Sequence, residues 1–141
     1  MKKSFSTTLL IIASLGIGVI AGRMTQAADA SGKVFELRTY TTPEGRLSDL
    51  HKRFREHTMK IFERHGMTNV GYWTPQDPPL AGHTLIYVIS HKSRADAEKS
   101  WKDFRDDPEW QKVKAASEAN GQIVTKVESV FLETTDYSPM K

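Results

Sequence analysis

The sequence predicts an α+β domain with ferredoxin-like βαββαβ order, preceded by a short export signal. Three observations support this prediction. Short segments that alternate or are wholly apolar indicate strands, and segments with helical periodicity lie between them. Glycine, proline and asparagine separate these segments, as expected for turns. A charged start followed by an apolar run occupies roughly the first thirty residues, which is typical of a secretory signal.

Residues 1–30 are expected to be a cleavable signal peptide, and residues 31–141 the domain. Lys2 and Lys3 supply the positive start, and residues 9–22 are apolar or small without a charge. This run of about fourteen residues is shorter than the roughly twenty that a membrane-spanning helix needs, which favours cleavage over an uncleaved anchor. We expect cleavage after Ala27 or Ala30, export to the periplasm or the medium, and no stable membrane anchor afterwards.

The signal also carries the basic excess of the chain. The whole sequence has 20 Lys plus Arg against 17 Asp plus Glu, a formal charge of +3. Lys2, Lys3 and Arg23 lie before Ala27, so cleavage there leaves 17 basic and 17 acidic residues. A neutral mature chain gives no reason to expect a nucleic-acid partner. The lack of cysteine excludes thiol catalysis and thiolate metal sites.

The first strand and helix of the domain have opposite kinds of pattern. Residues 34–40 (VFELRTY) alternate, with an apolar face and a mixed face that carries Glu36, Arg38 and Tyr40. A turn follows at residues 42–45. Residues 46–65 form the next periodic segment, whose apolar stripe and charged opposite side predict a surface helix that ends before Gly66.

Two further strands and a split helical crossover complete the order. Residues 69–74 and 84–90 are expected strands, and the second is apolar on both sides, which favours a central position in the sheet. Ser93 is a predicted helix cap. Asp107 followed by proline predicts the start of another helix, with aspartate at the N-cap and proline in the first turn. The last strand is expected over residues 123–132.

Three ordered motifs make the chain similar to the NIPSNAP family. They are Glu-Leu-Arg-Thr-Tyr at 36–40, the segment 65–73 with His-Gly-Met and Gly-Tyr-Trp, and Phe-Arg-Asp-Asp-Pro-Glu-Trp at 104–110. The resemblance spans residues 33–133. It implies a homodimeric α/β barrel, in which two ferredoxin-like sheets pack face to face. It implies no catalytic residues, and the family's mitochondrial roles do not suit a chain with an export signal.

The mixed face of the first strand supplies the main candidate site. If the barrel forms, we expect Glu36, Arg38 and Tyr40 to point into it. Buried charges are costly unless paired, so a Glu36–Arg38 contact or a cross-dimer pair is the structural interpretation. The functional alternative is a pocket in which Arg38 holds an anionic ligand and Tyr40 donates a hydrogen bond. Trp73 is expected either to line the same cavity or to be ordinary core.

The histidines add two candidates but no metal site. His51 lies within the apolar stripe of the first helix, where it is either hydrogen-bonded core or the wall of a cavity. His57 lies at the edge of that stripe, near a cleft mouth or water. His51 and His65 are about 21 Å apart along a helix with 1.5 Å rise per residue, so they cannot share an ion. We therefore expect no metal and no cofactor.

Two functions follow from these candidates. One is an exported, dimeric, small-molecule-binding or interaction domain without catalysis, which the lack of a coherent catalytic set favours. The other is a cofactor-independent monooxygenase or isomerase for a small apolar substrate, which requires Arg38, Tyr40 and a helix histidine to meet at one open cavity. A haem site is disfavoured, because the domain is small for a porphyrin pocket.

Overall fold

The computed structural model describes residues 32–140, so the expected signal peptide lies outside the described residues. Within them, four strands form one antiparallel sheet in the order β2-β3-β1-β4. The strands are β1 (Val34–Thr41), β2 (Thr68–Trp73), β3 (Thr84–His91) and β4 (Lys126–Leu132). This order is that of a ferredoxin-like sheet, and β3 is central, as its apolar sequence predicted.

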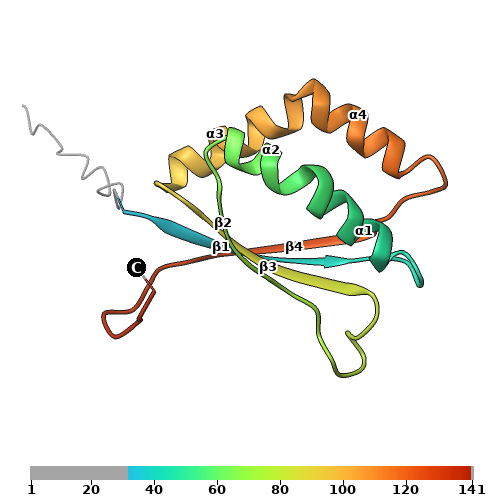
Figure 1. The fold of residues 1–141 in the computed structure, drawn as a ribbon. Helices are drawn as coiled ribbons and strands as arrows, with labels where there is room; N and C mark the ends of the chain where they lie inside the picture. The colour runs from blue at the N-terminus through green and yellow to red at the C-terminus, as the bar shows by residue number, and fades with distance from the viewer. Residues whose placement is uncertain (1–31, 141) are drawn as a thin grey trace, which may run out of the picture.

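The helices cover one face of this sheet (Figure 1). A first helical segment runs from Leu47 to Arg64 as α1 (Leu47–Arg53), the π-helical turn η1 (Phe54–Thr58) and α2 (Met59–Arg64). The crossover to β4 consists of α3 (Arg94–Asp106) and α4 (Pro108–Ser117). None of the helices in the described range combines the length and apolar character that a membrane span requires.

Side-chain caps fix where α3 and α4 begin. The Ser93 side chain accepts a hydrogen bond from the Asp96 backbone N–H at 3.0 Å. The Asp107 carboxylate accepts from the backbone N–H groups of Glu109 and Trp110, and Pro108 follows in the first turn. Both caps agree with the sequence prediction, because serine and aspartate satisfy amides that the helix itself leaves open.

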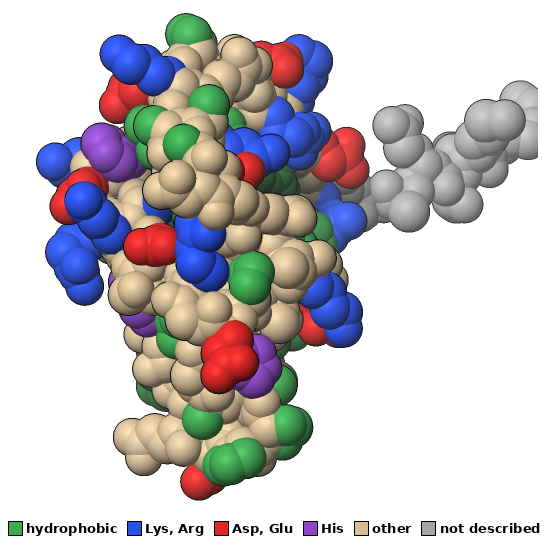
Figure 2. All heavy atoms as spheres, turned by 90° about the vertical axis from the view of Figure 1, so that its right-hand side faces the viewer, with side chains coloured by type: hydrophobic (Ala, Val, Ile, Leu, Met, Phe, Trp, Pro, Cys, Tyr) green, Lys and Arg blue, Asp and Glu red, His purple; other side chains and the backbone are tan. Residues whose placement is uncertain are grey.

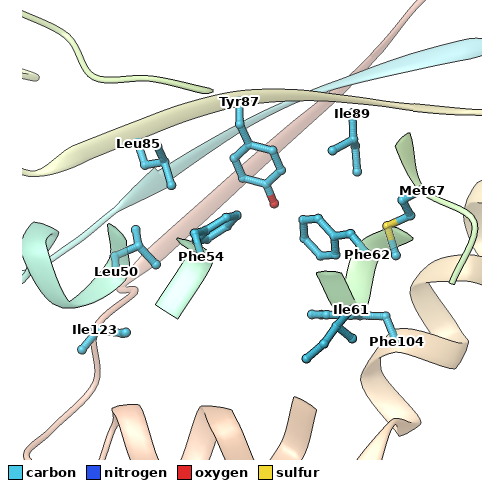
Figure 3. Close-up of a cluster of buried hydrophobic side chains, with 10 residues drawn as sticks. All are labelled: Leu50, Phe54, Ile61, Phe62, Met67, Leu85, Tyr87, Ile89, Phe104 and Ile123. Carbon is cyan, nitrogen blue, oxygen red and sulfur yellow. The ribbon is translucent and has the colours of Figure 1, made fainter. Parts of the chain in front are cut away.

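The core lies between the helices and the sheet and is rich in aromatic rings (Figure 3). Leu85, Tyr87 and Ile89 project from β3 toward the helices, where Phe54 and Phe62 meet them. Tyr87 is fully buried, and its ring lies 5.2 Å from that of Phe54, centroid to centroid. Large rings in edge-to-face contact make this layer the main source of buried apolar area.

Among residues 32–140, no helix covers the opposite face of the sheet. Strand alternation places Leu37, Ile86 and Val88 on this face, and all three are half-buried. Val130 and Leu132 of β4 lie opposite β1 on the same side and are 54% and 40% exposed. We call this surface the helix-free face.

The direction in which the polar side chains of β1 point differs from the expectation. Glu36, Arg38 and Tyr40 do not point to the helix-free face, which a barrel interior would use. They point toward the helices: the Trp101 indole of α3 contacts Glu36, and the Phe54 ring contacts Tyr40. The expected inward orientation is wrong, because the sequence shows that two faces differ but not which one the helices cover.

Two boundaries also differ. The helix predicted over residues 46–65 is interrupted by the π-helical turn, where the Met59 N–H bonds to the Phe54 carbonyl. The Thr58 hydroxyl donates to the Arg53 carbonyl at 3.2 Å, which supports the wider turn. The strand predicted from residue 123 begins only at Lys126, and Ile123 is instead a fully buried loop residue.

Candidate functional site

Glu36 is the centre of a buried polar network, which we call the Glu36 network. One carboxylate oxygen accepts from Arg38 and Ser129, both at 2.6 Å. The other accepts from Trp101 at 2.7 Å and from His91 at 3.0 Å. Glu36 is 1% exposed, so four donors compensate the burial of its charge.

These contacts determine the protonation of the carboxylate. Burial by itself raises the pKa of Glu36, but hydrogen bonds from His91, Ser129 and Trp101 and the charge of Arg38 lower it to about 2. Glu36 is therefore ionised at neutral pH and is unsuited to act as a general base or acid there. The expected contact between Glu36 and Arg38 is present, at 2.6 Å.

Arg38 is enclosed rather than open to a ligand from solvent. Its guanidinium lies 4.1 Å from the centre of the Trp101 ring and 5.5 Å from that of Tyr40. Two hollows on the described part of the chain, the cleft and the groove described below, are not lined by Arg38 or Tyr40. Neither of these two is therefore the open cavity, shared by Arg38, Tyr40 and a helix histidine, that the monooxygenase or isomerase hypothesis requires.

A cleft of about 350 Å³ opens instead between the first helical segment and the sheet edge formed by β2. It combines aromatic and aliphatic walls with two basic side chains. Its lining residues are His51, Phe54, Arg55, Met59, Tyr72, Trp73, Thr74 and Leu85. The π-helical turn supplies Phe54 and Arg55, which places this wider turn directly at the cleft.

The cleft brings together two of the six residues singled out in the sequence, His51 and Trp73. Burial, followed by the charge of Arg55, lowers the pKa of His51, so its imidazole is favoured in the neutral form. Trp73 is 54% exposed, and its ring lies so close over Gly71 that a Cβ there would approach it to 2.4 Å. Glycine at 71 therefore allows the tryptophan to lie flat against the strand.

His57 belongs to a different hollow. A groove of about 640 Å³ runs between α1 with η1 and α4, and His57, Lys52 and Lys112 line it together with acidic residues. The buried Arg53 also lines it and pairs with Glu118 at 3.2 Å. The mixed charges of this groove favour no single class of ligand.

Several residues with structural importance were missed by the sequence analysis. His91 and Trp101 bind Glu36, and Tyr87 is in the centre of the core. The alternation of β3 carries a signal for two of them, because Tyr87 and His91 share a face with Leu85 and Ile89. Trp101 gave no such signal, since its partner is 65 residues away in the sequence.

His65 lies where the end of the first helical segment meets the start of α4. His65 ends the first helical segment and its Nε2 lies 2.7 Å from the Asp107 carboxylate, which also pairs with Arg64. It therefore links that helix end to the cap of α4. Among residues 32–140 no group of three or more potential ligand side chains is arranged to hold a metal ion.

The fold and cleft define a ferredoxin-like α+β domain with an apolar, partly basic cleft at the helix–sheet boundary. The NIPSNAP family model matches residues 35–139. The chain therefore belongs to the NIPSNAP family.

Solved structures agree with this assignment. A NIPSNAP family protein from Agrobacterium tumefaciens superposes with a TM-score of 0.68 at 22% identity, covering 78% of this chain and 92% of that one. An uncharacterized NIPSNAP-like domain protein from Burkholderia xenovorans gives 0.67 at 16% identity, with 77% and 90% covered. At these identities the likeness establishes the fold alone.

One of the more distantly similar structures is an enzyme. SnoaB from Streptomyces nogalater, a cofactor-independent oxygenase, gives a TM-score of 0.51 at 11% identity, with 77% of this chain and 98% of that one covered. This similarity also concerns the fold and carries no residue roles. Curated protein sequences give no match.

Proposed function

We propose that the protein is an exported homodimeric domain that binds a small apolar molecule in the cleft between the first helical segment and β2. The observation that carries the proposal is the composition of the cleft: Phe54, Tyr72 and Trp73 form aromatic walls, and His51 and Arg55 add polar groups. A mostly apolar hollow of this volume with few polar groups is the usual form of a small-molecule site.

The dimer is supported by the helix-free face. Val130 and Leu132 are exposed there, beside half-buried Leu37, Ile86 and Val88 of the same face. A sheet of this kind needs a second layer to cover its apolar side, and a second copy offers the same apolar surface. The two sheets would then pack face to face, with each cleft on the outer, helical side of its own sheet.

Export is supported by the sequence of residues 1–30 and by the charge of the domain. On the face shown in Figure 2, basic and acidic side chains lie next to each other over the helical part, without a large surface of one sign. Such a surface favours neither nucleic acid nor an anionic membrane as the partner. The mixed charge of this surface is therefore compatible with a small-molecule ligand.

Fragment binding followed by NMR tests the cleft. We expect small bicyclic hydrocarbons such as tetralin to shift the amide signals around His51, Arg55 and Tyr72. Met59→Trp, which fills the cleft from a half-buried position, is expected to abolish these shifts. Lys114→Trp on exposed α4 is the control for added aromatic surface. Shifts confined to other surfaces, or equal shifts in Met59→Trp, would contradict the proposal.

A further inference from the structure

The layer between helices and sheet contains hydrogen-bond donors without acceptors. Within the part of the chain that the structure describes, Arg38 Nε, Arg53 Nε and the Tyr87 hydroxyl are buried and have no hydrogen-bond partner. Most buried polar groups in proteins have one, so each of these atoms calls for a physical reason. Two of them are nitrogens that can only donate, and the third is a hydroxyl that can donate.

Two of these donors, on Arg38 and Tyr87, lie together with Tyr40, and we call these three residues the donor cluster. An Arg38 guanidinium nitrogen lies 3.5 Å from the Tyr40 hydroxyl, and the Tyr40 and Tyr87 rings are 5.3 Å apart. The Tyr87 hydroxyl points away from the sheet toward the helices (Figure 3).

The donor cluster lacks hydrogen-bond acceptors, but the positive charges of the buried arginines are already balanced. Arg38 is paired with Glu36 at 2.6 Å, and Arg53 with Glu118 at 3.2 Å. An added carboxylate would therefore bring an unbalanced charge into a buried site, which is costly. An uncharged carbonyl oxygen offers two lone pairs to the donors without that cost.

Two aromatic residues of the cleft, Phe54 and Tyr72, contact the donor cluster. Phe54 lines the cleft, and its ring centre lies 5.2 Å from that of Tyr87 and 6.0 Å from that of Tyr40. Phe54 also begins the π-helical turn, so its side chain is attached where regular helix bonding is interrupted. Tyr72, another cleft residue, stacks on Tyr87 with 5.3 Å between ring centres.

From these observations we infer that the natural ligand is an uncharged, flat, ring-containing molecule with a carbonyl oxygen. Its apolar body lies in the cleft, and displacement of the Phe54 ring brings its carbonyl oxygen to the Tyr87 hydroxyl and the Arg38 guanidinium. This inference rests on the proposed function, since it assigns a ligand class to the same cleft. It also gives a role to the hydroxyl of the fully buried Tyr87.

The test compares 1-tetralone with tetralin, two molecules of nearly equal shape that differ by the carbonyl oxygen. We expect 1-tetralone to bind about tenfold or more tightly in an NMR titration, because it satisfies buried donors. Tyr87→Phe removes only the hydroxyl, so the folded protein should keep or raise its melting temperature. In this variant the advantage of 1-tetralone over tetralin should fall severalfold, while tetralin binding is unchanged.

Thr84→Val is the matched control. Thr84 also has a buried hydroxyl without a partner, but strand alternation places it on the opposite face of β3 from Leu85 and Tyr87. Its replacement should leave both affinities unchanged.

The outcomes separate this inference from the proposed function. If neither compound binds at the cleft, the proposed function fails. If both bind there equally, or if the preference for 1-tetralone survives in Tyr87→Phe, the cleft stands and the carbonyl inference is wrong. Tighter binding of 1-naphthoate than of 1-tetralone would also overturn it, since that result requires a receptor for an anion.

Discussion

The Trp101 indole nitrogen donates a hydrogen bond of 2.7 Å to Glu36, and this contact joins α3 to the central part of the sheet. The same indole lies over the Arg38 guanidinium at 4.1 Å. One tryptophan thus contacts both members of a buried ion pair that lies on strand β1. The contact ties the crossover helices to the strand that carries the candidate residues.

Trp101→Phe is predicted to destabilise the protein by about 1–3 kcal/mol, because it keeps most of the ring but removes one donor from a buried carboxylate. The midpoint of urea unfolding measures the effect. Trp110→Phe is the control, since Trp110 is a half-buried tryptophan of the same crossover that does not contact Glu36. Equal losses in both variants would show that ring size, and not the bond to Glu36, matters.

The Glu36 network also predicts how stability depends on pH. The pKa of Glu36 is about 2 in the folded protein, lower than its ordinary value of 4.5. The folded state therefore binds this proton less readily than the unfolded state, so the contribution is full above about pH 4.5 and is lost as pH falls toward 2. The urea concentration at the midpoint of unfolding should therefore decline as the pH falls from 4.5 to 2, and it should decline less steeply in Glu36→Gln than in the wild-type protein. A parallel decline in both proteins would assign the effect to other carboxylates.

Asp107 is predicted to have two separable roles. It caps α4, and it pairs with Arg64 and His65 from the end of the first helical segment. Asp107→Ala removes both roles and should cost about 1 kcal/mol for the cap alone, with a further loss from the pairing. Asp107→Asn keeps a capping oxygen and should lose less. Thermal unfolding of the two variants measures the difference, and identical losses would leave no role for the cap.

The helix-free face is predicted to hold the dimer together. Val130→Lys places a charge in the expected interface and should lower the mass seen by light scattering from two chains to one. Val127→Lys is the matched control, because Val127 lies on the same strand with similar exposure, 47% against 54%, but on the other face. A dimer that survives Val130→Lys, or a wild-type protein that is monomeric, would contradict the prediction.

Local patterns in the sequence predicted the order of the strands and helices, the central place of β3 and the caps at Ser93 and Asp107. Alternation, helical periodicity and capping are local properties, and neighbouring residues express them. Local patterns also indicated that Glu36 and Arg38 pair, since they are two residues apart on one strand face.

Only the tertiary structure decided which face of β1 the helices cover and which residues complete the site. His91, Trp101 and Ser129 reach Glu36 from 55, 65 and 93 residues away, and no local pattern records such distances. The cleft and the donor cluster have the same origin, because Phe54 and Tyr87 meet only when the first helical segment packs on β3. Periodicity divides a strand into two faces, but packing alone assigns each face its neighbours.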